Sequence, residues 1–339
     1  MINKKLEDCL EYIQPTKYIV SSERYSDEFS IPVLTAGKSF ILGYTNETDG
    51  IFRANKENPV ILFDDFTTDI KWVDFPFKVK SSACKILIPK EGCNIRYLYY
   101  AMKSIQFNHS DHKRYWISTY SKLAIRVGNI SEMERIVNKL DSISDLIDIK
   151  EKQILELNEL VKSRFIEMFG NNVGDLNFSD VLVDKTKEGY KFDSTNYLKA
   201  GEIAIIDQGK DLICGFKSKE KDKIPYEKEC IIFGDHTEIF KFINFPIYLG
   251  ADGTKILLVK EDFDTRFVYE FLSIHYVKVG GYSRHFKFLK EQRFLKPDIK
   301  KQKEFRLFCE QIDKLISIVQ SQINDLQELL DKKMDEYFG

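Results

Sequence analysis

The strongest constraint on the fold is an internal repeat: the 339-residue sequence aligns with itself at a spacing of about 170 residues. Residues 60–77 match residues 230–247 with seven identities in 18 positions, where chance would give about one. Two further pairs of segments match: 31–44 with 203–216, and 154–170 with 323–339. The spacing drifts from 172 to 169 along the chain, as small loop insertions and deletions would produce. The chain is therefore a duplication, and both copies are expected to fold alike.

Each copy has a globular part followed by a helical part. Short β-branched and aromatic runs between Gly, Pro, Asn and Asp turns predict mixed α/β domains. The predicted strands are Ile31–Leu34, Val60–Phe63, Cys84–Ile88, Ile203–Ile206, Ile231–Phe233 and Lys255–Val259, with helices near Arg96–Ser104 and Thr265–His275. The predicted segments are a first head at 1–130, a central helix at 131–170, a second head at 171–300 and a C-terminal helix at 301–339.

The two helical parts carry apolar residues at heptad spacing and contain no Gly or Pro before Gly170 and Gly339. The seam residues are Ile136, Leu140, Ile143, Ile147, Ile154, Leu157 and Val161, then Phe305, Ile312, Ile316, Val319, Ile323, Leu326 and Leu330. Each seam is one stripe wide, so each helix needs the other as its partner. With short connections, the order head–helix–head–helix predicts an antiparallel coiled coil and an approximate twofold axis. Ser131 and Glu134 form the expected N-terminal capping box.

The net charge of −2 conceals a division of charge along the chain. The helices are acidic, with nine acidic against six basic residues in 131–170 and eight against five in 302–339. Two stretches at the same place in the repeat are basic: 96–127 has six lysines and arginines against one aspartate, and 276–301 has eight against two acidic residues. Aromatic residues lie among the basic ones, a composition typical of a phosphate-contacting surface. We therefore expect nucleic acid at the heads and protein partners at the helices.

Several other classes of protein are disfavoured. The sequence contains no Gly-rich S-adenosylmethionine loop, no Asn/Asp-Pro-Pro-aromatic adenine pocket and no G-x-x-x-x-G-K-[ST] phosphate loop. It has no apolar run long enough to span a membrane and no apolar stretch behind its first lysines, so we expect neither a span nor a signal peptide. The six cysteines are scattered without a C-x-x-C pair, which indicates reduced thiols, no zinc site and a cytoplasmic protein.

With these features, the chain resembles the specificity subunits of type I restriction–modification systems. The resemblance lies in IPVLTAGKSFILGYTNET (31–48), IIDQGKDLICGF (205–216), GGYSRHFKFLKE (280–291), helices ending in MFG and YFG, and the alternation of heads and helices. It implies a subunit without catalytic activity or cofactor, whose two target-recognition domains each read one half of a split, asymmetric site in double-stranded DNA. It also implies that the helices fix the gap between the half-sites and dock two adenine-methylating modification subunits, which ATP-dependent restriction subunits can join.

Candidate DNA contacts follow from comparing the two copies. Lys38 and Lys210 are shared, as are Arg114 and Arg284; shared residues cannot distinguish different half-sites, so we assign them to phosphates. Base readout is expected at equivalent positions that differ between the copies: Thr35/Asp207, Ala36/Gln208, Ser39/Asp211, Phe66/His236, Thr68/Glu238 and Tyr115/His285. Among them, Gln208 is suited to adenine. Lys113, Ser283 and Lys287, beside the shared arginines, are further DNA-binding candidates.

Two alternatives stay open. A coiled-coil scaffold would use the helices alone and would have heads without coincident basic patches. A metal-dependent nuclease needs clustered carboxylates, for which Asp64-Asp65 and Asp235-His236 are the candidates. Because Thr67 and Thr237 follow at the same distance, we expect Asp65 and Asp235 to organise a turn after a strand instead.

Overall fold

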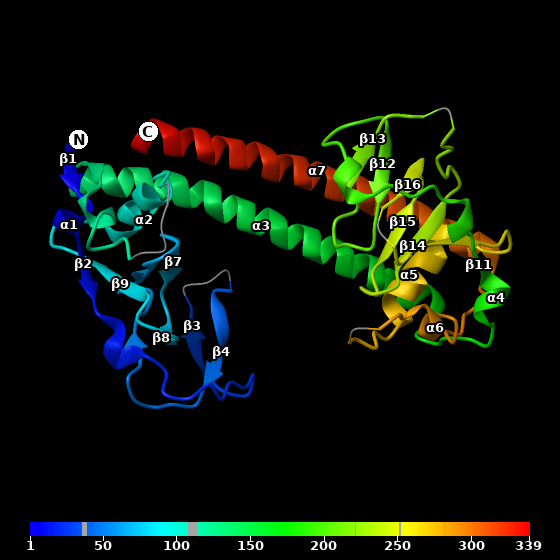
Figure 1. Cartoon of the computed structure of the whole chain (residues 1–339), viewed down its shortest axis with the longest axis horizontal. Coiled ribbons are helices and arrows are strands. Elements are labelled where there is room, and N and C mark those ends of the chain that lie inside the picture. Colours follow the sequence, from blue (N-terminus) through cyan, green and yellow to red (C-terminus); the bar gives the residue numbers. More distant parts are fainter. Residues whose placement is uncertain (36–38, 108–113, 221, 251, 282) are drawn as a thin grey trace. The chain divides into compact units, whose positions relative to one another are not determined.

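The computed structural model describes residues 1–35, 39–107, 114–220, 222–250, 252–281 and 283–339 (Figure 1). They form two compact units: unit 1 is Met1–Lys150 with Gln322–Gly339, and unit 2 is Glu151–Ser321. Each unit contains one head and a part of both long helices. Among the described residues, no helix is long and apolar enough to cross a membrane.

The head of unit 1 is built mainly from two sheets. Its elements are β1 (Ile2–Lys5), α1 (Leu6–Cys9), β2 (Leu10–Ile13), β3 (Ile31–Leu34), β4 (Ile41–Thr45), β5 (Phe52–Arg53), β6 (Val60–Asp64), β7 (Ile70–Val73), β8 (Pro76–Val79), β9 (Cys84–Pro89), α2 (Ile95–Lys103) and β10 (Ala124–Val127). One sheet has the antiparallel order β2-β9-β6-β7. The other has the order β4-β3-β8-β5, with β3 and β8 parallel, and β1 pairs separately with β10.

The head of unit 2 repeats this plan. Its elements are α4 (Phe178–Val181), β11 (Leu182–Asp184), β12 (Ile203–Ile206), β13 (Gly215–Lys217), β14 (Cys230–Gly234), β15 (Phe240–Ile243), β16 (Ile247–Leu249), β17 (Thr254–Val259), α5 (Thr265–His275) and α6 (Phe286–Leu289). Its sheets have the orders β11-β17-β14-β15 and β13-β12-β16. Ile61 pairs with Leu87 and Ile231 pairs with Leu257, so the register repeats 170 residues further on. The predicted strands and short helices are confirmed within a residue or two.

The two long helices are α3 (Ile130–Phe169) and α7 (Ile299–Phe338). In unit 1 the beginning of α3 shares a core with the end of α7, where Met133 and Leu140 belong to the same cluster as Leu330 and Tyr337. In unit 2 the end of α3 shares a core with the beginning of α7. The helices are thus antiparallel within each unit, and every predicted seam residue is buried or half-buried.

The predicted cap of the central helix is wrong by two residues. The side chain of Asn129 accepts from the Glu132 N–H at 2.9 Å, and the Glu132 carboxylate accepts from the Asn129 N–H at 3.3 Å. This is the reciprocal geometry of a capping box, formed two residues earlier than Ser131 and Glu134. The predicted C-terminal stop is confirmed: Gly170 has φ +77° and its N–H donates to the Ile166 carbonyl at 2.8 Å.

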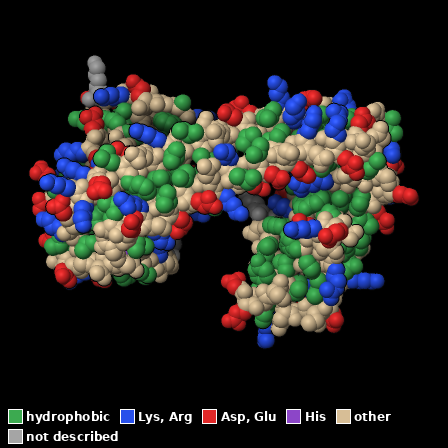
Figure 2. Space-filling view, turned by 180° about the vertical axis from the view of Figure 1, so that it is seen from behind, with side chains coloured by type: hydrophobic (Ala, Val, Ile, Leu, Met, Phe, Trp, Pro, Cys, Tyr) green, Lys and Arg blue, Asp and Glu red, His purple; other side chains and the backbone are tan. Residues whose placement is uncertain are grey.

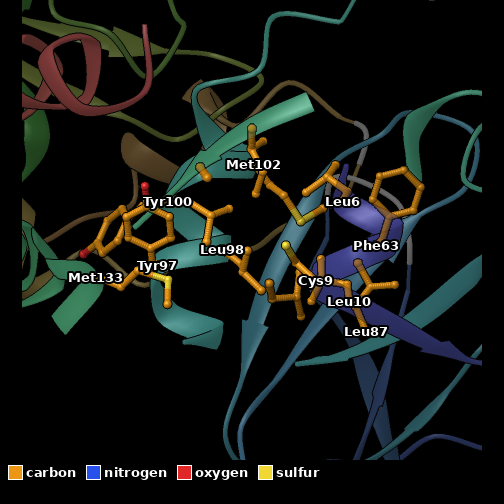
Figure 3. Close-up of a cluster of buried hydrophobic side chains, with 14 of the residues drawn as sticks. Leu6, Cys9, Leu10, Phe63, Leu87, Tyr97, Leu98, Tyr100, Met102 and Met133 are labelled. Atoms are coloured by element: carbon orange, nitrogen blue, oxygen red, sulfur yellow. The ribbon is translucent and has the colours of Figure 1, made fainter. Parts of the chain in front are cut away.

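Apolar side chains tie each head to the helices of its own unit. In unit 1, Leu6, Phe63, Leu87 and Tyr97 lie with Met133 of α3 in one cluster that draws on α1, β6, β9 and α2 (Figure 3). In unit 2, the buried ring of Phe165 on α3 lies 5.5 Å from that of Phe267 on α5 and 5.4 Å from that of Phe305 on α7. Removing a large buried side chain from such a cluster costs about 3–5 kcal/mol. In each unit, one cluster of the head is therefore shared with the helical segments.

Candidate nucleic-acid interface

In the first head, three loops meet at the C-terminal end of β6. The turn after β6 begins at Asp64, whose carboxylate accepts from the Phe66 N–H at 2.8 Å. The next residue, Asp65, accepts from the Tyr115 N–H with its carbonyl at 2.9 Å and from the Trp116 N–H with its carboxylate at 2.8 Å. Its backbone N–H also donates to Ala83, so the turn, the loop before β9 and the segment from Arg114 are joined. We call this arrangement the loop junction.

The second head contains the same loop junction. The Asp235 carbonyl accepts from the His285 N–H and its carboxylate accepts from the Phe286 N–H, both at 2.8 Å. The Asp235 N–H donates to Gly253, the counterpart of Ala83. Among the residues that the structure describes, two non-glycine residues have positive φ, Thr68 at 60° and Glu238 at 54°, and they lie 170 residues apart in the two turns. The prediction that Asp65 and Asp235 organise turns is confirmed, and each also anchors a distant loop.

The loop junctions carry the shared arginines at the surface. Arg114 is exposed, donates to the Ser82 hydroxyl at 2.9 Å and lies over the Phe66 ring at 5.9 Å. Arg284 is also exposed, and the Lys191 ammonium, helped by the Arg284 guanidinium, lowers the pKa of Asp252. Ser82 and Asp252 occupy equivalent positions in the repeat. Each head thus presents one arginine in the same setting, beside a different polar neighbour.

Two residues predicted to contact bases, Tyr115 and His285, have side chains that lie inside the heads. Tyr115 is 2% exposed and belongs to the unit 1 core, where its ring lies 5.2 Å from that of Phe107. His285 is 0% exposed, with its Nδ1 3.6 Å from the Glu238 carboxylate. Neither ring can reach a base edge without unfolding its loop. Both residues instead support the arginine that precedes them in the chain.

The assignment of Gln208 to adenine is also not supported. Its side-chain oxygen accepts from the His236 N–H at 3.2 Å, and its side-chain nitrogen donates to the Asp252 carbonyl at 3.2 Å. The side-chain amide therefore bonds to two loops of the junction, and both its oxygen and its nitrogen, which would pair with adenine, already have partners. Gln208 is better described as a brace that connects the loop after β12 to the junction.

The remaining candidates lie at or near the surface, except for two that fall outside the described residues. Lys38 and Lys113 are those two. Ser39, Lys210, Asp211 and Lys287 are exposed, and Thr35, His236 and Ser283 are half-buried. The structure joins His236 to Ser283, whose carbonyl lies 3.1 Å from the ring Nδ1. By contrast, Lys210 lines a cavity of about 630 Å³ beside α3 and α5.

Two arginines in the duplicated sequence hold the heads to the helices. Arg96 donates to Asp141 of α3 at 2.7 Å and lies over the Trp72 ring at 4.7 Å. Arg266, its counterpart, donates to Asp313 of α7 at 3.1 Å and lies over the Phe242 ring at 5.3 Å. Arg96 is one of the lysines and arginines counted in the basic stretch 96–127, but its charge is paired with Asp141. The positive charge that the first head has available for phosphates is therefore smaller than the sequence indicates. Identity between the copies therefore marks structural contacts, and is not by itself a sign of DNA contact.

The described residues contain no group of three or more His, Cys, Asp or Glu side chains placed to hold a metal ion. Asp64 and Asp65, the candidate nuclease carboxylates, are 6% and 1% exposed and accept hydrogen bonds from backbone N–H groups. Asp235 is engaged in the same way in the second head. The carboxylates at these loops thus serve the backbone.

Replacing Asp235 with alanine is expected to destabilise unit 2 by about 1–3 kcal/mol, because the buried Phe286 N–H loses its acceptor. Urea unfolding followed by fluorescence measures this change. Asp252→Ala is the matched control: its side chain is 93% exposed and its pair with Lys191 lies at the surface, so the change should stay within about 0.5 kcal/mol. Equal losses from both variants would contradict the anchoring role of Asp235.

Comparisons with known proteins agree on one kind of protein. No protein-family model matches the chain. The specificity subunit of the type I restriction enzyme EcoR124I/EcoR124II from Escherichia coli is 52% identical over 126 residues. That match covers 36% of this chain and 31% of the relative, so the chain matches only about a third of the length of that relative.

Solved structures extend the likeness to the whole chain at the level of fold. The S subunit of a type I restriction–modification system from M. genitalium aligns over 100% of this chain and 96% of its own, with a TM-score of 0.59 and 14% identity. A structure reported for complex assembly and conformational transition of the type I R-M system aligns over 99% and 97%, with a TM-score of 0.50 and 12% identity. The predicted fold class, mixed α/β domains in two copies with two long antiparallel helices, is confirmed. The chain is thus similar in sequence, over about a third of its length, to a type I specificity subunit, and similar in fold, over its whole length, to a solved S subunit.

Proposed function

We propose that the chain is the DNA sequence-specificity subunit of a type I restriction–modification complex and has no catalytic activity or cofactor of its own. The observation that carries this proposal is the duplicated loop junction, which presents Arg114 and Arg284 at equivalent surface positions with different neighbours. Two similar but non-identical readers in one chain suit a target with two different half-sites. The 52% identity to a type I specificity subunit supports the same function.

Within each head we assign separate roles to shared and differing residues. Arg114, Arg284 and Lys210, with Lys38, contact phosphates and set the position of the head on the duplex. The candidates left for DNA contact that lie at or near the surface are Thr35, Ser39, Asp211, His236, Ser283 and Lys287, and Lys113, outside the described residues, stays a candidate by sequence. Tyr115, His285 and Gln208 are reassigned to holding the loops. Removing one phosphate contact should reduce the slope of the logarithm of the binding constant against the logarithm of the salt concentration by about one, whichever DNA sequence is bound.

The helices offer a surface for two copies of one partner. Three apolar pairs 169 residues apart, Leu146/Leu315, Ile149/Ile318 and Leu160/Leu329, are all between 41% and 59% exposed. On a helix that turns about 100° per residue, the three positions fall within roughly 60° of one another and off the buried seam. Apolar side chains among charged ones are visible on one face of the molecule (Figure 2).

Each compact unit holds one set of these residues. Unit 1 contains Leu146, Ile149 and Leu329, and unit 2 contains Leu160, Leu315 and Ile318. We call these sets the helix patches. Exposed apolar residues on an acidic helix are unsuited to DNA and suited to a protein. We assign one adenine-methylating modification subunit to each patch, and the helices set the gap between the half-sites. ATP-dependent restriction subunits would join this complex, and we propose a cytoplasmic location, where free thiols such as these persist.

Mapping methylated adenines tests the proposed function. The chain is expressed with its partner modification subunit, and genomic DNA is sequenced by a method that detects N6-methyladenine, against a strain without the chain. We expect a new motif of two short, different half-sites around a fixed unspecified gap. Methylation by the modification subunit without any motif that depends on the chain would refute the proposal and favour the coiled-coil scaffold.

A further inference from the structure

Glu238 is a buried carboxylate in the second head. It is 3% exposed, lies in the turn after β14 and has φ 54°, a conformation that side-chain-bearing residues rarely adopt. A buried carboxylate is costly unless hydrogen bonds replace its water. Here the Glu238 carboxylate accepts from the Val279 N–H at 2.9 Å, the Gly280 N–H at 2.8 Å and the Tyr276 hydroxyl at 2.9 Å. All of its donors come from the segment that leads to Arg284.

These contacts keep Glu238 charged. Burial opposes ionisation, but the Val279 and Gly280 N–H groups, the Tyr276 hydroxyl and His285 together lower the pKa of Glu238 below its usual value. Glycines at 280 and 281 with φ of 70° and 82° let the chain turn back over the carboxylate. An anion that gathers donors from successive backbone groups fixes the path of that backbone.

His285 holds the other end of the same segment. Its ring is 0% exposed; Nε2 lies 3.2 Å from the Gly281 carbonyl and Nδ1 lies 3.6 Å from the Glu238 carboxylate. Nε2 is thus within hydrogen-bonding distance of the Gly281 carbonyl, whereas Nδ1 makes no hydrogen bond and packs beside the Glu238 carboxylate. The His285 N–H is bonded to Asp235, so the ring cannot leave without releasing the loop junction.

We propose that Glu238 is the positioning residue of the second head: it holds residues 276–281 and 283–285 in the form that presents Arg284 to DNA. The inference rests on the proposed function and adds a residue that never touches DNA itself. The first head has Thr68 at the equivalent turn position and Tyr115 in place of His285, so it contains neither the buried carboxylate nor the imidazole. The two heads therefore fix their arginines by different chemistry, and damage at Glu238 affects one half-site only.

A double-mutant cycle tests this inference with the full chain in complex with its modification subunits. Binding is measured to a duplex carrying the mapped split site, for wild type, Glu238→Gln, Arg284→Ala and the double variant. Glutamine has the same shape but offers one acceptor where two N–H groups need one each. We expect each single variant to bind this duplex about tenfold more weakly than wild type. The double variant should also bind only about tenfold more weakly, because an arginine that is no longer held in position contributes nothing that a second substitution could remove. Tyr276→Phe, which removes one donor and keeps the packing, should lose about threefold and be non-additive with Arg284→Ala.

The matched control is Glu238→Gln combined with Arg114→Ala in the first head. Those losses should multiply to about a hundredfold, since the sites are independent. The positioning role would be overturned if the affinity losses of Glu238→Gln and Arg284→Ala multiplied in the double variant. It would also be overturned if neither Glu238→Gln nor Tyr276→Phe changed DNA binding. If wild type binds no split site at all, the proposed function fails instead, so the two failures are distinguished. Should Glu238→Gln not fold, the Tyr276→Phe cycle decides alone.

Discussion

A glutamate in place of Leu160 or Leu329 is expected to remove one of the two modification subunits from the complex. Each leucine is exposed in a different helix patch, Leu160 in unit 2 and Leu329 in unit 1. Burying a new carboxylate at the centre of an apolar interface costs at least about 2 kcal/mol, or roughly thirtyfold in affinity. Native mass spectrometry should show one bound subunit for each single variant and none for the double variant. The unfolding free energy should change by less than about 0.5 kcal/mol, since both side chains are exposed.

Leu155→Glu is the matched control for this result. Leu155 is 65% exposed on the same helix, but its counterpart is Asn324 and it points roughly 160° away from the helix patch positions. The variant should bind two modification subunits as wild type does. If Leu155→Glu releases a subunit and Leu160→Glu does not, the partner occupies the opposite flank of the helix. Loss of both subunits from a single leucine variant would instead indicate one shared docking site.

The elements of the fold were readable from the sequence because their signals are periodic and occur twice. The seam of α3 and α7 repeats over the whole length of both helices, so a single irregular position such as Lys150 does not obscure it. The helix cap was harder to place. Asn129 with Glu132 and Ser131 with Glu134 offer the same residue types at the same spacing, and spacing alone cannot choose between them.

The site was only partly readable, because residues that differ between copies were taken to lie at the surface. At Tyr115 and His285 the difference belongs to the core. One head fills this position with an aromatic ring packed on Phe107, and the other with a histidine facing a buried glutamate. Glu238 was considered only as a differing position, and its role depends on Val279 and Gly280, some forty residues away. The replacements at the Thr68/Glu238 and Tyr115/His285 positions depend on each other, and an alignment of two copies that compares one position at a time cannot reveal such a dependence.

Identity between the copies carried more information than difference did. Asp65 and Asp235 are identical because the carboxylate of each accepts a backbone N–H from a distant loop, that of Trp116 in one head and Phe286 in the other. Arg96 and Arg266 are identical because both pair with a helix carboxylate. Arg114 and Arg284 are identical, yet they are exposed and sit in different surroundings. Identity without a shared internal partner is the pattern that indicates an external one, and it separates Arg114 and Arg284, the proposed DNA contacts, from the two structural arginines.

Lengthening both long helices by one heptad is expected to change the gap in the DNA target and leave both half-sites intact. Seven residues add about 10 Å to a helix, which equals about three base pairs of duplex. A heptad also returns the apolar seam to within about 20° of its original direction, so the two helices can still pair. The insertions belong after Lys150 and after Ser321, where the compact units meet, as second copies of 144–150 and 315–321. Methylated-adenine mapping should then show the same half-site bases around a gap longer by about three.

The lengthened chain should also bind its new target more weakly than wild type binds its own. Three extra base pairs turn the second half-site by about 100° around the duplex, whereas the heptad turns the helix by only about 20°. Binding to the longer target therefore requires either that the DNA is twisted or that one head shifts its position, and either change costs binding free energy. An insertion into one helix alone is the control: it displaces the antiparallel seam by seven residues and should destabilise the chain. If the double insertion altered the half-site bases while the gap stayed constant, the helices would not set the gap, and the loop junctions alone would have to fix the spacing.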